Sequence, residues 1–338
     1  MTLLEFLAQN IVKASVLLAA AFAASWVLRN RAAALRHFVW TAAMAALLLL
    51  PFAIAVAPQR GWRTMPVKQT VAAVAHGSVR VSQAPAAPSS PRLPLLLLAW
   101  VAGFLAVGVR FARGAARTAR MVRRATPAPA AEAGEMARGV RLLESAEAPM
   151  PLVWGIRRPA VVLPLEARGW PAERLRTVVL HERMHVERGD LVAQALGQAA
   201  CCLYWFHPLV WLAARRLRTE RERACDDAVL LRGVLAHDYA GHLLALVQSL
   251  AARKAGWASV AGMAESSGLE SRVRALLDRR RRRHPLSRRA ALAVSAAGLA
   301  LILPLATLST SAQVTRGGLA GVVKDPSGAR VPGTDVTA

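Results

Sequence analysis

The chain has 338 residues, 55% of them hydrophobic, with a mean hydropathy of +0.33 and a formal net charge of +24. Soluble globular chains average about 45–50% apolar residues even when glycine is counted, so this composition argues against a wholly soluble protein. The three cysteines, Cys201, Cys202 and Cys225, have the spacing of neither a disulfide framework nor a four-cysteine zinc site. We interpret them as reduced, structural thiols.

Four apolar stretches lie along the chain, at residues 3–28, 38–57, 93–109 and 290–308. Each approaches or reaches the roughly 17–25 residues that span the hydrocarbon core of a bilayer. A cleaved signal peptide is disfavoured for the first stretch, because its basic residues follow the apolar run instead of preceding it. The sequence therefore predicts a mainly α, integral membrane protein with about four transmembrane helices.

The positive charge gathers beside the ends of these stretches, as the positive-inside rule predicts for cytoplasmic segments. The basic run at 279–283 is also of a kind that attracts nucleic acid, but its place beside an apolar stretch favours the bilayer, and we expect no direct nucleic-acid partner. The predicted topology places 29–37 and 111–289 in the cytoplasm. The N-terminus, 58–92 and the tail after Leu308 lie outside it.

The apolar stretches also set the predicted domains. Residues 1–113 form a membrane domain with three helices, and 114–289 form a cytoplasmic domain. Residues 290–308 are the fourth transmembrane helix, and 309–338 are an extracytoplasmic tail.

Within the cytoplasmic domain, short aliphatic runs bounded by proline and glycine predict strands at 140–143 and 160–163. Helix-favouring residues occupy 171–235, with breaks predicted near Gly197 and Pro208. Residues 256–268 are predicted to form a loop.

The sequence His181-Glu182-Arg183-Met184-His185 carries the main chemical signal. Histidines four residues apart lie on one face of an α-helix, where both can bind one Zn²⁺. Glu182 then projects beside the open position of the metal, where it can accept a proton from the attacking water. The pattern arises by chance in on the order of one such chain in a hundred, so a third ligand has to support it.

A downstream helix supplies candidates for that ligand. Glu222 and Asp226 are four residues apart, and a carboxylate from this segment, which we assign to Glu222, completes a His₂Glu set with one position left for water. Asp226 is predicted to orient one of the ligand histidines through its other ring nitrogen, and Asp190 is a second candidate for that role.

A structural metal site in a non-catalytic signalling or scaffold protein is the alternative interpretation. Such a site closes all four positions with protein ligands, whereas no fourth ligand is evident here and Glu182 stands beside the metal. For the stabiliser of the developing oxyanion, the sequence offers His237, Tyr239 and His242, but it favours a solvated or core role for each of them.

Together these residues resemble the BlaR/MecR-type membrane metallopeptidases, bacterial zinc proteases related to antibiotic sensors. Residues 155–164 look like the family's strand before the zinc helix, and Arg188 with Asp190 is similar to its extended zinc motif. Residues 207–211 resemble its linker segment and 222–226 its third-ligand segment.

The resemblance covers roughly residues 11–308. It implies a cytoplasmic α+β, gluzincin-like zinc peptidase domain in a multi-pass protein of the bacterial inner membrane. It also implies the substrate, which is either the chain itself or a cytoplasmic winged-helix transcriptional repressor cleaved in signal transduction.

Two features depart from the family pattern. None of the four lysines has a serine three residues before it, so the Ser-x-x-Lys nucleophile of a penicillin-binding sensor domain is absent from this sequence. Residues 321–333 instead resemble the first hairpin of a carboxypeptidase-regulatory-like β-sandwich, a fold that needs about 100 residues. We expect either that this domain is truncated in the tail or that the tail is only a vestige of it.

Residues 191–214 are apolar enough for one further span, which would place His181 and Glu222 on opposite sides of the bilayer. A break near Pro208 resolves the conflict, because it lets the chain return as a re-entrant or membrane-associated helical hairpin.

Two segments are candidates for contact with substrate. The strand at 160–163, bounded by Pro159 and Pro164, is predicted as an edge to which an extended peptide adds. The loop at 256–268 is predicted as a site of self-cleavage.

Overall fold

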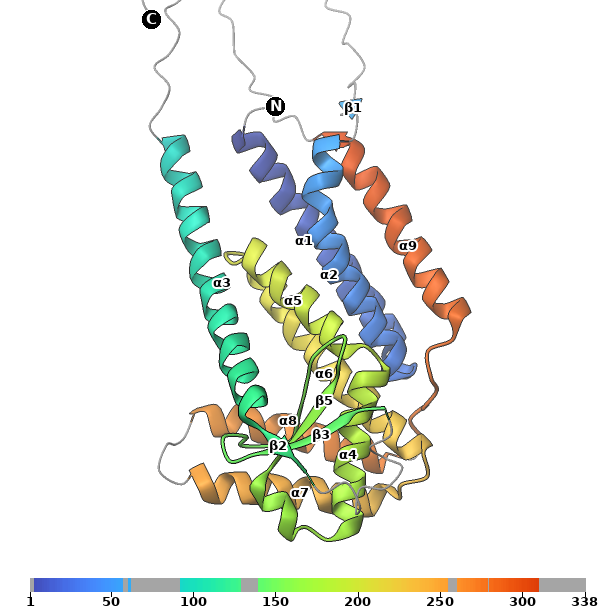
Figure 1. Cartoon of the computed structure of the whole chain (residues 1–338). Coiled ribbons are helices and arrows are strands. Elements are labelled where there is room, and N and C mark those ends of the chain that lie inside the picture. The colour runs from blue at the N-terminus through green and yellow to red at the C-terminus, as the bar shows by residue number, and fades with distance from the viewer. Residues whose placement is uncertain are drawn as a thin grey trace, which may run out of the picture.

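In the computed structural model of the protein, the described residues are 3–56, 60–61, 92–128, 139–254, 260–278 and 280–309. These parts are mainly helical, with a small sheet (Figure 1), as the composition predicts. Most of the 58–92 segment and the tail after Ser309 lie outside the described residues, so the expected β-sandwich hairpin does too.

Four of the described helices are long and apolar enough to cross a membrane, by length and composition. They are α1 (Leu3–Val27), α2 (Ala33–Val56), α3 (Arg92–Arg124) and α9 (Arg288–Thr307). Figure 1 shows them side by side at one end of the molecule, with the sheet at the other end. These helices indicate a membrane protein. The third is longer than predicted, since it continues from the apolar stretch through a basic segment to Arg124.

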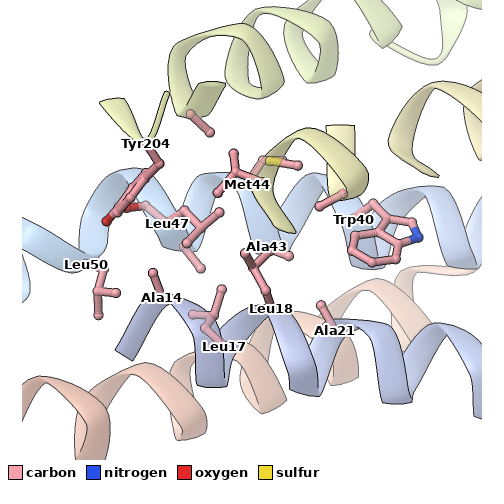
Figure 2. Close-up of a cluster of buried hydrophobic side chains, with 14 of the residues drawn as sticks. Ala14, Leu17, Leu18, Ala21, Trp40, Ala43, Met44, Leu47, Leu50 and Tyr204 are labelled. Atoms are coloured by element: carbon pink, nitrogen blue, oxygen red, sulfur yellow. The ribbon is translucent and has the colours of Figure 1, made fainter. Parts of the chain in front are cut away.

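The contact between α1 and α2 is built from small and aliphatic side chains (Figure 2). Ala14 and Ala21 of α1 and Ala43 of α2 are buried, and Leu18 and Leu47 fill the space between the helices. Small residues allow helix backbones to approach closely, which is the main source of packing energy between apolar helices in lipid. The short 3₁₀ helix η1 (Leu28–Asn30) joins the two.

A helical hairpin packs into this bundle from the other end of the chain. Helix α5 (Asp190–Leu203) ends in a turn, and α6 (Pro208–Leu231) runs back. Pro208 starts α6, a position where the missing N–H of proline costs nothing. The predicted break near Gly197 is wrong, because Gly197 lies inside α5 against Leu217. The break occurs instead at Gly189, whose φ of 68° favours glycine.

The turn of the hairpin is held by the membrane helices. The Tyr204 hydroxyl donates to Oδ1 of Asn10 at 2.9 Å and lies 3.1 Å from the carbonyl oxygen of Leu47. The indole N–H of Trp100 donates to the carbonyl oxygen of Leu203 at 3.2 Å. The indole N–H of Trp205 donates to the carbonyl oxygen of Trp100 at the same distance. The turn therefore lies among α1, α2 and α3, as Figure 1 also shows.

The sheet has the strand order β2-β3-β5-β4. Strands β3 (Arg141–Ser145) and β5 (Ala160–Pro164) are parallel, and β4 (Leu152–Trp154) is antiparallel to β5. The prediction of β5 as an edge strand is wrong: it lies between two neighbours, and its five residues are all buried. Strand β4, which the sequence did not predict, forms the edge. Strand β2 is Thr126–Pro127, and β1 (Arg60–Gly61) pairs separately with β6 (Leu308–Ser309).

Helix α4 (Ala172–Glu187) lies between the sheet and the last helices of this part. One face, with Val178 and Val179, packs with Val161 and Leu163 of β5 through a shared cluster. The opposite face, with Leu180 and Met184, packs with residues of α6, α7 (Ala236–Lys254) and α8 (Val260–Leu277). Burial on both faces fixes the rotation of α4 about its axis. The loop predicted at 256–268 is wrong from Val260 onward, where α8 already begins, and its start lies outside the described residues.

Candidate metal centre

His181 and His185 lie one turn apart on α4, and Glu222 approaches both of them from α6. The Nε2 atoms of the two histidines are 3.7 Å and 3.9 Å from Oε2 of Glu222. The side chains of His181, His185 and Glu222 are 10%, 12% and 22% exposed. The structure thus brings together the three residues that the sequence assigns as ligands.

The donor set fits a zinc ion. One ligand atom from each of the three residues lies within 4.8 Å of the others. Tetrahedral zinc with ligand distances of about 2.0–2.2 Å holds its ligand atoms about 3.3–3.6 Å apart, so the observed separations need only a small contraction. Two imidazoles and one carboxylate leave the fourth position open, which is the donor set of catalytic zinc sites.

Asp190 fixes the orientation of His185. Its Oδ2 atom lies 2.8 Å from Nδ1 of His185, and the Cys225 thiol donates to the same oxygen at 3.1 Å. The proton on Nδ1 is therefore directed at the carboxylate, which leaves the Nε2 lone pair free for a metal. His185, Asp190 and Cys225 also form a second group of possible ligand atoms, but in that arrangement the three groups already satisfy one another.

Asp226 acts on His181 through a tyrosine. The Tyr239 hydroxyl lies 2.7 Å from Nδ1 of His181 and donates to Oδ1 of Asp226 at 2.7 Å. The direct distance from His181 Nδ1 to Oδ1 of Asp226 is 3.5 Å. Because the hydroxyl proton points to the carboxylate, its oxygen accepts the Nδ1 proton, and Nε2 of His181 is again free for a metal.

Two arginines that the sequence did not single out border the site. Arg272 of α8 donates twice to Asp226, at 2.9 Å and 2.7 Å, and lies 3.5 Å from Oε2 of Glu222. Arg221 donates to Oε1 of Glu222 at 2.8 Å and 3.1 Å. Burial alone would raise the pKa of Glu222, but the contact with His181 and the neighbouring positive charges hold it well below its usual range. Glu222 is thus kept as an anion.

Glu182 has a different environment from the ligands. Its carboxylate lines the cavity beside the two histidines. Burial raises the pKa of this carboxyl, and the charge of Glu222 adds to the shift, although His185 opposes it. A buried carboxylate with a raised pKa accepts a proton more readily than a solvated one.

The cavity has a volume of about 380 Å³ and holds all of the candidate site residues except Asp226. Strand β4, which is the free edge of the sheet, lines the same cavity as the histidines, together with Met150 and Pro151. Leu243 and Leu246 of α7 line it as well, which gives the cavity apolar surface beside its polar centre.

Of the three residues considered for the oxyanion, Tyr239 lines the cavity and the two histidines do not. Tyr239 reaches His181 on the ring nitrogen that faces away from Glu222, so it positions the ligand. The His237 side chain is 74% exposed and pairs with Asp238, and neither His237 nor His242 lines the cavity.

The site also touches the second apolar helix. Nε2 of His37, near the start of α2, is 3.9 Å from Oδ1 of Asp190, and Arg188 lies 3.1 Å from Nδ1 of His37. Arg188 in turn pairs with Asp190 at 3.4 Å. A residue of α2 is therefore separated from the candidate ligand His185 by a single side chain.

Comparison with known proteins agrees with this geometry. Residues 5–276 match the sequence model of a family described as BlaR1 peptidase M56. Over 80 residues the chain is 36% identical to the regulatory protein BlaR1 of Bacillus licheniformis. That alignment covers 24% of this chain and 13% of the relative, so it spans a small part of the relative's length.

Proposed function

The chain belongs to the BlaR1 peptidase M56 family, and from this premise we propose that it is a membrane-embedded zinc endopeptidase. The observation that carries the proposal is the convergence of His181, His185 and Glu222, with Glu182 beside them in a cavity. Family membership supports peptidase activity. The identity of the metal and the role of each residue are our assignments.

In the proposed mechanism, His181, His185 and Glu222 hold the zinc, which supplies Lewis-acid polarisation of the substrate carbonyl. Glu182 accepts a proton from the attacking water and then delivers it to the nitrogen of the leaving amine. The bond that forms joins the water oxygen to the peptide carbonyl carbon, and the bond that breaks is the C–N bond. Asp190 and Tyr239 keep Nδ1 of each histidine protonated throughout, so that both rings stay in the orientation that the site needs.

The substrate is proposed to bind along β4. Along β4, the backbone N–H and C=O groups of alternate residues point toward β5. The groups of the residues between them point to the other side, where they can bond to an added strand. Such a strand would lie over the histidines in the cavity. Strand β4 thus replaces β5 as the proposed docking edge. Pairing along this edge would select extended peptide segments in place of folded proteins.

The membrane arrangement belongs to the same proposal. We place the peptidase domain, 114–289, in the cytoplasm of a bacterial inner-membrane protein, with the N-terminus and the tail outside. The hairpin of α5 and α6 is then membrane-embedded at its turn, where Tyr204 and Trp205 contact α1, α2 and α3. A peptidase site at the base of this hairpin lies close to the bilayer surface.

For the substrate, we propose the chain itself or a cytoplasmic winged-helix transcriptional repressor. The relative from Bacillus licheniformis is described as a regulatory protein, which supports a role in signal transduction. The contact between His37 of α2 and Asp190 gives the membrane helices a physical route to the metal ligands.

A structural metal site in a non-catalytic signalling protein remains the second candidate. The three-ligand set argues against it, because structural zinc sites fill four positions with protein ligands. Glu182 also has no structural partner to explain its burial among the described hydrogen bonds and ion pairs.

Expression of the wild type beside Glu182→Ala, each with a tag at both ends, tests the proposal. We expect a cleaved chain or a cleaved co-expressed repressor with the wild type alone. Intact products from both proteins, under every stimulus applied, would favour the structural-metal alternative.

A further inference from the structure

A cavity of about 760 Å³ lies apart from the candidate metal centre and shares no lining residue with it. It is bounded by the end of α1, by η1, by the start of α2, by one face of α6 and by Asp278 and residues 280–282, which follow α8. Eight of its fifteen lining residues are arginines, and two are carboxylates, Glu220 and Asp278. We call it the arginine cavity.

The two carboxylates do not neutralise this charge. Arg36 contacts Oε2 of Glu220 at 2.8 Å and 2.9 Å, and Arg223 donates to Oε1 at 2.9 Å, so both oxygens are engaged. Asp278 accepts the backbone N–H of Arg280. The lining therefore carries six more positive than negative formal charges. Arg281 also faces a carboxylate outside the lining, Asp227, at 4.0 Å.

Several donors around the arginine cavity are also left without partners. Nε of Arg223, Nη2 of Arg281 and Nε1 of Trp40 are buried and have no hydrogen-bond partner among the described residues. Burial lowers the pKa of Arg281. The positive charges of Arg36 and Arg223 lower it further, whereas the carboxylate of Asp227 raises it. Unpaired buried donors are costly, and several at one place indicate a missing acceptor.

The other wall of the cavity is aromatic. Phe22, Trp26 and Trp40 line it, and Trp26 is 66% exposed. The guanidinium of Arg29 lies 4.5 Å above the Trp26 ring. These residues are at the ends of two helices long enough to cross a bilayer, where tryptophan and arginine gather at the headgroup level.

We propose that the arginine cavity binds the phosphate group of an anionic ligand, and that this ligand is the headgroup of an anionic phospholipid such as phosphatidylglycerol. Arginines supply paired donors that match phosphate oxygens, and the aromatic wall accommodates the glycerol and upper acyl region. Basic pockets between membrane helices on the cytoplasmic side are suited to such headgroups. If these arginines served only to set the orientation of the protein in the membrane, they would remain solvated. Their donors would then not be buried without partners.

The test uses the full chain in nanodiscs and the double variant Arg216→Gln/Arg282→Gln. Both arginines line the cavity, and no hydrogen bond or ion pair is described for either, so the variant removes charge without breaking a described contact. The matched control is Arg110→Gln/Arg113→Gln, which removes the same charge from exposed positions of α3 outside the cavity. Lipids that remain bound after transfer to detergent are counted by native mass spectrometry.

We expect the wild type and the control to retain one phosphatidylglycerol per chain in preference to phosphatidylcholine. The cavity variant should bind it about tenfold more weakly or worse, from the attraction typical of two basic residues at a membrane surface. Equal retention by the wild type and the cavity variant would overturn the proposal, as would equal losses in the cavity variant and the control.

Two further arms separate the sources of phosphate and guard against misfolding. Pyrophosphate is added to lipid-free protein in neutral detergent, and thermal stabilisation by it without any preference for phosphatidylglycerol would show that the lipid assignment is wrong. Trp40→Phe keeps an aromatic side chain, although a smaller one, and removes the unpaired N–H. Because it leaves all charges in place, weaker retention of phosphatidylglycerol by this variant, at an unchanged unfolding temperature, supports the cavity as the site. Unchanged retention by both Trp40→Phe and the arginine variant contradicts it.

Discussion

Oδ2 of Asp190 lies 2.8 Å from Nδ1 of His185, in the turn of chain that joins α4 to α5. The same carboxylate faces His37 of α2, so it stands between the candidate metal ligands and the apolar helix bundle. Asp190 is almost fully buried, and the hydrogen bond with His185 and the charges of Arg188 and His185 lower its pKa against the effect of burial. A charged acceptor at this position fixes the tautomer of the histidine.

We therefore expect Asp190→Asn to weaken zinc binding about 10–100-fold, the usual effect of losing the carboxylate behind a ligand histidine. Competition against a chelator of known affinity measures the change. Asp238→Asn is the matched control, since Asp238 is exposed and pairs with His237 outside the cavity. Wild-type affinity in Asp190→Asn would contradict the assignment.

Arg272 is expected to stabilise the site by holding Asp226. Asp226 is buried and accepts two hydrogen bonds from Arg272, which is partly exposed, so removing Arg272 leaves an uncompensated buried charge at a cost of about 3–5 kcal/mol. Arg272→Gln should lower the unfolding temperature strongly, as measured by tryptophan fluorescence. Arg272→Gln/Asp226→Asn should recover part of that loss, because it removes both charges. Strictly additive losses would show that the pair is not coupled.

The edge of β4 gives a prediction about substrate binding. Successive residues of a strand direct their backbone groups to opposite sides, so one of Leu152 and Val153 faces β5 and the other faces the cavity. Proline removes the N–H. Of Leu152→Pro and Val153→Pro, one should lower the unfolding temperature, and the other should keep it while raising KM for a peptide substrate. If no variant that keeps the wild-type unfolding temperature has a raised KM, the substrate does not bind by backbone pairing along this edge.

The turn of the hairpin depends on a glycine in α3. A Cβ added to Gly103 would lie 2.1 Å from Cε2 of Trp205, whereas a Cβ at Gly108 of the same helix meets nothing within 4 Å. We expect Gly103→Ala to destabilise the protein by about 1–3 kcal/mol through overpacking, and Gly108→Ala to leave it unchanged or slightly more stable. Thermal unfolding of both variants in the same detergent checks this. Equal behaviour would mean that the turn is not packed against α3.

The sequence predicts well what rests on local spacing. The apolar stretches predicted the helices that are long enough to cross a membrane, because span length follows from bilayer thickness. The His181–His185 spacing placed both imidazoles on one helical face, and the break predicted before Pro208 is where α6 begins. The resemblance to BlaR/MecR-type peptidases is confirmed by the family match across residues 5–276.

What the sequence could not give depends on contacts through space. Arg272 reaches Asp226 from a helix 46 residues away, and one arginine among so many carries no local signal. Strand β4 has three residues, too few for an alternating pattern, so its place at the edge could not be anticipated. The sequence also favoured Asp226 over Asp190 for orienting a histidine. The structure gives Asp190 the direct contact with His185, while Asp226 acts through Tyr239.

In the proposed function, Glu182 is a catalytic base beside a zinc ion held by other residues. The most direct test is one measurement on purified full-length wild type and Glu182→Gln, in which peptide-bond cleavage is followed at equal, independently determined zinc content. We predict about one zinc per chain in both proteins, and cleavage by the wild type alone, because the variant loses the base and keeps every ligand. Equal cleavage by the two proteins, or a wild type that holds zinc and cleaves nothing, would contradict the account.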